Sequence, residues 1–322
     1  MIVRHSLDEL PRVLDELGLE RPFVVASERW SELELGVEPA GRWSEVPSDR
    51  IDELAAAAAE ADALLAVGGG SAIDLAKAVS AVTGLPVVSI PTTYAGAEWA
   101  TNFGIRDPGR RMRGGGAGAH LAGIVYDVEL TLGLPLEQSV GTALNALAHC
   151  AEALYVKGRN AGADRAALEG ATTIACALPR VAANLRDRDA RRELLAGAEA
   201  AGMALGSAGL GLGHAMAQAV GGRYGLPHGA LNAICLPPAL RFNEPVARDE
   251  IRRFGEAIGA DDAAERVREL ARLGGFERLR DLGVREEDLP ELGEVGSRRG
   301  GAQANPRPAT AEEITELLRS VW

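Results

Sequence analysis

The sequence predicts a protein of two halves: an α/β domain with a parallel sheet over residues 1–130, and an all-helical domain over residues 131–322. Four short, continuous apolar runs predict buried strands, at 22–27, 63–67, 86–90 and 123–127. Helical patterns separate these runs, which is typical of a parallel sheet covered on both faces. From residue 131 onward, long Ala- and Leu-rich helical patterns follow one another without a strand, and they predict the second half.

The composition is typical of a globular protein with an acidic surface. The chain has 322 residues, 47% of them hydrophobic, and a formal net charge of −12 with no long basic run, which argues against nucleic acid as a partner. No apolar run reaches about 18 residues, the length of a membrane span. The first residues lack a signal pattern, and the three cysteines lack metal-site spacing. We therefore expect a cytoplasmic protein whose partner is neither a nucleic acid nor a membrane.

The elements of the first half begin with an amphipathic helix over 6–18, which Ser6 and Glu9 open with a capping-box pattern. The segment 31–48 is expected to be irregular, and a helix is expected over 52–61. A further helix follows the strand at 63–67 and extends to about residue 83.

The turn between that strand and its helix consists of three glycines and a serine, Gly68, Gly69, Gly70 and Ser71. Glycines let backbone amides approach a ligand, and a helix N-terminus favours a phosphate. Ser71 is also a candidate cap of the helix. The alternative is a tight turn that binds nothing. The next predicted strand, 86–90, is followed by the segment 91–93. In parallel sheets, ligands bind at the carboxyl ends of the strands.

In the second half, eight helical patterns are expected, at 136–157, 162–185, 189–208, 209–221, 229–242, 247–259, 261–273 and 310–320, and the segment 276–305 is expected to be less regular than these helices. Asn145 and His149 lie four residues apart, on one face of a helix. His214 and His228 flank helix-breaking glycines. One interpretation is three separate core or capping histidines. The other is a converging cluster, which would form a metal site or a catalytic pocket.

Several of these motifs together resemble the iron-containing alcohol dehydrogenase superfamily, which has a dehydroquinate synthase-like fold. They are the glycine motif at 68–77, the stretch at 91–98, Asn-Ala-Leu-Ala-His at 145–149, Gly-His at 213–214 and Leu-Pro-His-Gly at 226–229. Within that superfamily, Pro-Thr-Thr-Tyr-Ala-Gly at 91–96, Asn-Pro-Arg-Pro at 305–308 and Asn145 are most similar to maleylacetate reductases.

The resemblance implies an N-terminal dinucleotide domain, a helical C-terminal domain and an active site in the cleft between them. It implies that Gly68, Gly69, Gly70 and Ser71 hold the pyrophosphate of NAD(H) or NADP(H), flanked by Thr92 and Thr93. Ser27 supplies no carboxylate for a ribose hydroxyl, so both cofactors remain open. The resemblance also implies a homodimer.

In the metal-dependent branch of the superfamily, the metal ligands match positions 145, 149, 214 and 228. Here the set is Asn145, His149, His214 and His228, and a neutral carboxamide is a poorer ligand for a divalent ion than a carboxylate. Similarity to the reductase branch therefore implies a metal-free site in which these residues are catalytic. Zn²⁺ or Fe²⁺ on the three histidines is the alternative.

Three further residues are candidate substrate contacts. Tyr94 follows the threonines at a strand end. Arg223 could bind a substrate carboxylate, with an ordinary surface arginine as the alternative. Gln218 stands where the superfamily commonly has a histidine that helps in proton transfer.

The expected function is an NAD(P)H-dependent reduction of an unsaturated or oxo acid, as in maleylacetate reductases, with histidine-assisted protonation. The alternatives are a metal-dependent alcohol dehydrogenase and a diverged non-redox enzyme on the same fold.

Overall fold

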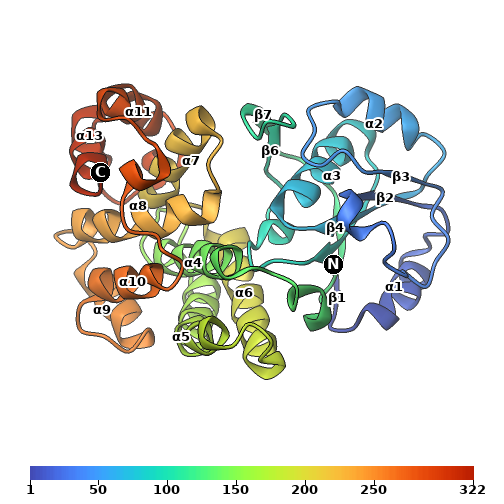
Figure 1. Ribbon diagram of the computed structural model, residues 1–322, viewed down its shortest axis with the longest axis horizontal. Coiled ribbons are helices and arrows are strands. Elements are labelled where there is room, and N and C mark those ends of the chain that lie inside the picture. Colours follow the sequence, from blue (N-terminus) through green and yellow to red (C-terminus); the bar gives the residue numbers. More distant parts are fainter. The chain divides into compact units, whose positions relative to one another are not determined.

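The computed structural model describes residues 1–322, and the chain forms two compact units (Figure 1). Unit 1 comprises Met1–Thr93 and Ala97–Gly133, and unit 2 comprises Tyr94–Gly96 and Leu134–Trp322. The three residues 94–96 therefore interrupt unit 1 and belong to the helical unit. This short excursion directly follows the threonines predicted to flank a cofactor.

Unit 1 is built on a six-stranded sheet in which every pairing is parallel, in the order β1-β8-β5-β4-β2-β3. The strands are β1 (Ile2–Arg4), β2 (Pro22–Ala26), β3 (Gly41–Trp43), β4 (Ala63–Gly68), β5 (Val87–Pro91) and β8 (Leu121–Val125). The predicted parallel sheet is confirmed. Its central strands β2, β4 and β5 are buried along their whole length, which explains why they appear as unbroken apolar runs.

Helices cover both faces of this sheet, because alternate side chains of each strand point to opposite faces. On one face, α1 (Leu10–Leu17) packs its apolar stripe on side chains such as Val24 and Leu65. On the other face, α2 (Ile51–Ala57) and α3 (Gly70–Thr83) pack on side chains such as Phe23 and Leu64. Figure 1 shows α3 beside strand β4, which precedes it in the chain.

Four strands of unit 1 were not predicted. Strands β1 and β3 have three residues each and lie at the two edges of the sheet, so neither is long enough to show an apolar pattern. Strands β6 (Phe103–Arg106) and β7 (Met112–Gly116) form a separate antiparallel hairpin. Strand β7 is mostly exposed and contains three glycines, a residue that is uncommon in strands.

The first predicted helix is shorter than expected. Residues Leu7–Glu9 form a 3₁₀ turn, and α1 begins only at Leu10. Ser6 accepts a hydrogen bond from the amide of Asp8 rather than from that of Glu9, so no capping box forms. Pro11, in the first turn of α1, suits this position because its missing amide hydrogen is not needed there.

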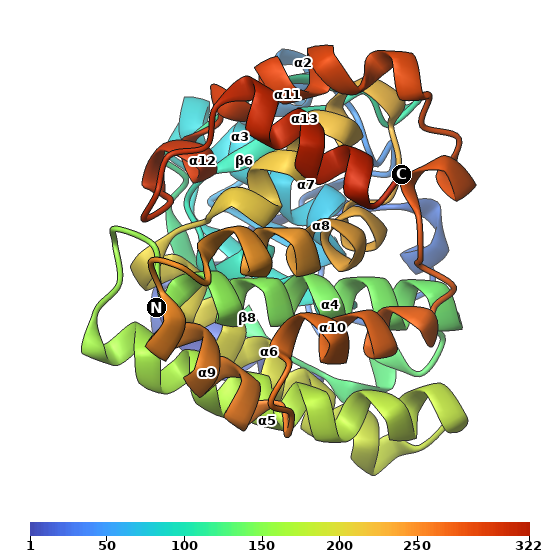
Figure 2. The ribbon, with the colours of Figure 1, turned by 90° about the vertical axis from the view of Figure 1, so that its left-hand side faces the viewer.

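Unit 2 is helical throughout, as predicted. Its helices are α4 (Leu136–Ala153), α5 (Ala161–Ala183), α6 (Arg188–Ala208), α7 (Leu212–Tyr224), α8 (His228–Asn243), α9 (Arg248–Ala257), α10 (Ala263–Arg272), α11 (Leu289–Ser297), α12 (Gly300–Ala304) and α13 (Ala311–Ser320). Helix α4 is central, and it packs against α5, α6 and α8. Figure 2 shows α11 and α13 side by side at one end of this unit, and α5 at the other.

The segment 276–305 is more regular than predicted, because α11 and α12 lie within it. Leu289 and Leu292 of α11 are buried and join a core cluster with Ile314 and Leu318 of α13. Only two of the nine residues of α11 are leucines, so its apolar stripe is weak in the sequence. The contact with α13 stabilises it.

No single helix is both long enough and apolar enough to cross a membrane. Helices α6 and α7 meet the length and composition criterion only when taken together, and they are bent by 98° at the break between them.

Candidate active site

The glycine turn of unit 1 lies where strand β4 ends and helix α3 begins. Gly68 has a φ of 149°, a value that other residues rarely adopt. Gly69 is the N-cap of α3, and Gly70 is its first residue. The first amides of a helix have no acceptor within it and lie at the positive end of its dipole. This turn can therefore bind the pyrophosphate of a dinucleotide.

The second predicted cofactor segment lies beside this turn. The amide of Thr92 donates to the carbonyl oxygen of Gly68 over 3.0 Å. A Cβ atom added to Gly69 would lie 2.9 Å from Cγ2 of Thr93. The structure thus brings the two segments together at the carboxyl ends of the neighbouring strands β4 and β5. Their close approach requires glycine at position 69.

Ser71 does not cap α3, which corrects our prediction. The helix begins one residue earlier, and no side chain accepts a hydrogen bond from its N-terminal amides. Ser71 instead lies in the first turn, where its side chain is half-buried. Its hydroxyl therefore does not cap the helix end.

Lys77 and Asp74 of α3 organise the chain where it re-enters unit 1. Lys77 is 1% exposed, and Nζ lies 2.7 Å from Oδ1 of Asp74. The same Nζ donates to three carbonyl oxygens, those of Ala97, Ala100 and Asn102, at 2.8, 3.1 and 2.6 Å. Oδ2 of Asp74 accepts a hydrogen bond from the amide of Gly104. This buried ammonium group is thus satisfied within the protein.

The four polar residues singled out in the helical half lie together in unit 2. Asn145 and His149 come from α4, His214 from α7, and His228 begins α8. The rings of His149 and His214 stack, with centroids 4.7 Å apart and planes 15° apart. The ring of His228 lies 5.6 Å from that of His214. The structure therefore brings together residues separated by up to 83 positions in the chain.

Hydrogen bonds fix the orientation of the Asn145 amide. Nδ2 of Asn145 donates to the carbonyl oxygen of Ala95 over 2.8 Å, so its Oδ1 must point the other way. That oxygen accepts a hydrogen bond of 2.6 Å from Nδ2 of Asn232. Nδ2 of Asn232 also lies 3.0 Å from Nε2 of His228. Because this amide group can only donate, Nε2 of His228 is the acceptor.

Both ring nitrogens of His214 face oxygen atoms. Nδ1 lies 2.6 Å from Oε2 of Glu152, and Nε2 lies 3.2 Å from Oδ1 of Asn145. Since Oδ1 of Asn145 can only accept, Nε2 of His214 is set to donate. A ring with a proton on each nitrogen suits this position.

His149 is 3% exposed, and its Nδ1 has no hydrogen-bond partner in the protein. Burial, followed by the neighbouring His214 and His228, holds the pKa of His149 well below its usual value. Gly96 approaches this ring closely: its φ is 73°, and a Cβ atom there would lie 3.4 Å from Nδ1. The neutral ring therefore presents a buried nitrogen that a bound molecule can use.

Two residues of this cluster were missed by the sequence analysis. Glu152 is 0% exposed and contacts His214, and Asn232 is also 0% exposed and contacts both Asn145 and His228. Both follow a predicted histidine at helical spacing, Glu152 three residues after His149 and Asn232 four residues after His228. That spacing on a shared helix face is the signal that could have identified them.

Tyr94 is fully buried. Its hydroxyl accepts a hydrogen bond of 3.0 Å from Nη1 of Arg191, and its amide donates to Oγ1 of Thr142. These contacts anchor Tyr94 in unit 2, immediately after Thr93. Gln218 lies on α7 one turn after His214, where it is half-buried.

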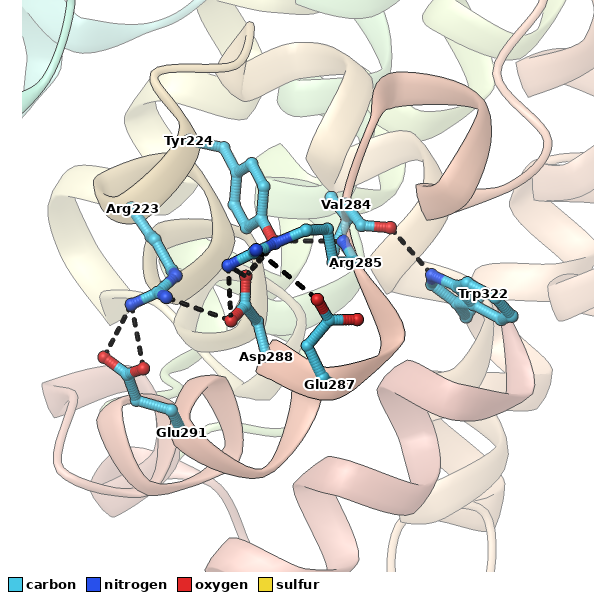
Figure 3. A network of polar contacts seen from close by, with 8 residues as sticks. All are labelled: Arg223, Tyr224, Val284, Arg285, Glu287, Asp288, Glu291 and Trp322. Carbon is cyan, nitrogen blue, oxygen red and sulfur yellow. Dashed lines mark hydrogen bonds and ion pairs between the residues drawn. The ribbon is translucent and has the colours of Figure 1, made fainter.

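Arg223, predicted as a substrate contact, lies in an ion-pair network at the end of α7 (Figure 3). Its Nη1 is 2.8 Å from both carboxylate oxygens of Glu291, and its Nη2 is 2.9 Å from Oδ1 of Asp288. Tyr224 and Arg285 bind the same Asp288. A substrate carboxylate would have to compete with two carboxylates already in place, so this geometry favours a structural role.

Comparison with known proteins supports this description of the two units. Residues 1–117 match the family model for iron-containing alcohol dehydrogenase. Residues 139–322 match the model for the C-terminal part of the Fe-containing alcohol dehydrogenase family. The two matches cover most of each unit, including the glycine turn and the polar cluster.

Individual relatives and solved structures agree. The chain is 36% identical to the maleylacetate reductase of Pseudomonas knackmussii, over 98% of this chain and 93% of the relative. It is also 36% identical to maleylacetate reductase 1 of Cupriavidus pinatubonensis, over 96% and 90%. The crystal structure of maleylacetate reductase from a Rhizobium species superposes with a TM-score of 0.89 and 31% identity, covering 100% of this chain and 95% of that chain.

An iron-containing alcohol dehydrogenase from Corynebacterium glutamicum superposes with a TM-score of 0.90 and 33% identity, covering 99% of this chain and 93% of that chain. Its likeness extends over both units. With both family models matched and relatives above 30% identity along nearly the whole chain, this protein belongs to the iron-containing alcohol dehydrogenase family and is an NAD(P)-dependent oxidoreductase.

Proposed function

We propose that the protein reduces an unsaturated or oxo acid of the maleylacetate type, using NADH or NADPH and no metal ion. The relatives that bear the name maleylacetate reductase support this substrate class. The motifs at 91–96 and 305–308 support it as well. The observation that carries the proposal is the amide of Asn145, which is held in the polar cluster where a metal site would have a carboxylate.

The chemistry of the donor atoms supports a metal-free site. A divalent cation needs ligand atoms whose lone pairs are free to converge on it. Here Oδ1 of Asn145 and Nε2 of His228 both receive the same N–H group, Nδ2 of Asn232. No three His, Cys, Asp or Glu side chains are arranged so that they would hold a metal ion. As arranged, these residues do not fit a metal, and no step of the proposed reaction uses one.

The cofactor fits the residues of unit 1. Gly68, Gly69, Gly70 and Ser71 bind the pyrophosphate at the N-terminus of α3, and Thr92 and Thr93 flank it. When bound, the reduced nicotinamide supplies a hydride to an electrophilic carbon of the acid. The protein contributes the rest of the chemistry, namely orientation, stabilisation of charge and one proton.

The polar cluster stabilises the negative charge that builds up on the acid and then protonates it. His214, with a donor on each ring nitrogen, is the proposed proton source, and it regains a proton from solvent. His149 stays neutral and offers Nδ1 as an acceptor to a polar group of the substrate. Asn145 holds Nε2 of His214 in place, and Asn232 sets the tautomer of His228 by donating to its Nε2.

The test is a rate measurement on protein treated with a strong chelator and shown by elemental analysis to be free of metal. Oxidation of NADH and of NADPH is followed with maleylacetate, with related oxo acids and with simple aldehydes. The proposal predicts turnover of maleylacetate that is unaffected by the chelator.

Activity that disappears with the metal and returns with Zn²⁺ or Fe²⁺ would instead assign a metal-dependent alcohol dehydrogenase. Binding of NAD(P)H without hydride transfer to any compound of the panel would assign a diverged, non-redox function. Both results contradict the proposal.

A further inference from the structure

Glu152 is a fully buried carboxylate at the back of the polar cluster. It lies on α4, its exposed fraction is 0%, and an unpaired charge at such a position is costly. Its Oε2 accepts a hydrogen bond of 2.6 Å from the amide of Gly211 and lies 2.6 Å from Nδ1 of His214. Its Oε1 accepts a bond of 3.1 Å from the amide of His214. Glu152 thus holds both the backbone and the ring of one histidine.

The sequence before His214 makes room for this carboxylate. A Cβ atom on Gly211 would lie 3.0 Å from Cδ of Glu152, and one on Gly213 would lie 3.0 Å from its Oε1. Both distances are tighter than ordinary van der Waals contact. Gly211 is also the N-cap of α7, and no side chain of its own segment caps that helix end. The carboxylate of Glu152 takes that place from another helix.

The consequence for His214 is a fixed ring. An imidazole attached by two rotatable bonds can turn through many orientations, and one strong hydrogen bond at Nδ1 selects a single one. With Nδ1 held by Glu152, Nε2 points to Oδ1 of Asn145. Glu152 contacts the ring of His214 directly, and that ring in turn contacts Asn145, so Glu152 acts on Asn145 through His214.

We propose that Glu152 is the positioning residue of this active site: it fixes the ring of His214 so that Nε2 faces the substrate position beside Asn145. This inference rests on the proposed function for its effect on the rate, but not for its effect on the ring. Glu152 needs no contact with the substrate or the cofactor for this role.

The test compares Glu152→Gln with Glu137→Gln, the same change at an exposed position of the same helix. Glutamine keeps one acceptor oxygen, but its amide donor must face either Nδ1 of His214 and the amide of Gly211 or the amide of His214, all of which are donors. We expect kcat to fall about 10- to 100-fold, with the KM for NAD(P)H unchanged. Ring-nitrogen NMR should show changed His214 signals in Glu152→Gln and unchanged signals in Glu137→Gln.

A second variant, Gly213→Ala, keeps the charge of Glu152 but pushes its Oε1 aside. It should reproduce the changed His214 signals and the lower kcat, and it gives the answer if Glu152→Gln does not fold. Glu152→Asp, which keeps the carboxylate on a shorter side chain, should retain more activity than Glu152→Gln.

The ring signals separate the two proposals because they need no substrate. If the wild type does not reduce the acid but Glu152→Gln alters the His214 ring, the function is wrong and the positioning role stands. If the wild type reduces the acid and neither Glu152→Gln nor Gly213→Ala alters the ring, the positioning role is wrong.

Discussion

The rings of His149 and His214 stack with their centroids 4.7 Å apart and their planes nearly parallel. Two positively charged rings in this arrangement would repel each other in a buried site. The contacts of His214 suit a proton on both of its nitrogens, whereas burial and the neighbouring rings hold the pKa of His149 well below 6.5. The stack therefore pairs a proton donor with a neutral ring.

The first prediction is that His149 stays neutral at a pH where ordinary histidines are protonated. In chelator-treated protein, the ring signals of His149 in NMR spectra should not titrate around pH 6.5. Because its pKa is lowered in the folded state, the unfolded chain binds the extra proton, and stability falls as the pH drops below about 6.5. Unfolding midpoints of the wild type should fall more steeply over this range than those of His149→Gln. A normal titration of His149 would contradict the prediction.

The second prediction concerns Asn145→Asp. In the metal-free protein, one carboxylate oxygen would face the carbonyl oxygen of Ala95, which now accepts a hydrogen bond from Nδ2 of Asn145. Loss of this bond should lower the free energy of unfolding by about 1–3 kcal/mol. The new carboxylate, with three histidines, forms a better ligand set for Zn²⁺. Added Zn²⁺ should therefore raise the melting temperature of the variant much more than that of the wild type.

Elemental analysis after removal of excess metal provides a second measurement on Asn145→Asp and the wild type. The variant should retain zinc and the wild type should not. Equal retention by both proteins would show that Asn145 does not decide metal binding.

The third prediction tests the glycine turn. In Gly69→Ala, the added methyl group would lie 2.9 Å from Cγ2 of Thr93, so one of the two cofactor segments must move. We expect about a tenfold loss of NAD(P)H affinity, equivalent to about 1.4 kcal/mol. Gly300→Ala is the control, since a Cβ atom there meets nothing within 4 Å. Fluorescence titration with NADH measures both, and equal affinities would contradict the assignment of the turn.

Much of the fold was predictable because the elements that carry it are long and strongly patterned. Strands β4 and β5 are buried over their full length, so each appears as an apolar run ended by turn residues. Strands β1 and β7 gave no such pattern, since one has three residues and the other is rich in exposed glycine. Their strand structure comes from pairing with β8 and β6, which local sequence does not encode.

The residues of the polar cluster also divide into those that the sequence indicates and those that it does not. Histidine is rare in this chain, so the sequence singles out three histidines near glycines that were predicted to break helices, although Gly221 and Gly222 lie inside α7. Glu152 did not, because glutamate is common and the sequence does not show which glutamate is buried. Its partners Gly211 and His214 lie about 60 positions further along the chain. Only the packing of α7 against α4 reveals why those residues are needed.

The fourth prediction concerns Asp288, at the centre of the network in Figure 3. The hydroxyl of Tyr224, followed by Arg285 and Arg223, lowers the pKa of its carboxyl below the usual value. A lowered pKa adds stability above the unfolded-state value of about 3.9, and this stability is lost as the pH falls further. Asp288→Asn should thus be less stable than the wild type at pH 7, and the difference should shrink below pH 4.

Denaturant midpoints at several pH values measure this effect. Glu287→Gln is the matched control, since Glu287 is exposed and its carboxylate lies 3.4 Å from Nη1 of Arg285. It should change the midpoint little at any pH. A constant difference between Asp288→Asn and the wild type across the pH range would rule out the lowered pKa as its cause.

The last prediction concerns Arg191, a fully buried arginine of α6. Its guanidinium donates to uncharged acceptors: the hydroxyls of Tyr94 and Ser139 and the carbonyl oxygens of Leu134 and Leu185. Tyr94 and Leu134 are the residues at which the chain enters unit 2 from unit 1. One side chain therefore anchors both entry points within the helical unit.

Arg191→Met would leave these buried acceptors without their donor, so the free energy of unfolding should fall by about 3 kcal/mol. Arg192→Met is the control, because Arg192 is adjacent, exposed and paired only with Asp189 at the surface. Chemical denaturation measures the loss, and hydrogen exchange locates it. Exchange should rise at residues 94–96 and near Leu134 in Arg191→Met alone, because their anchor is gone. If both variants lost the same stability, or if exchange rose elsewhere instead, Arg191 would not be the residue that holds these two segments.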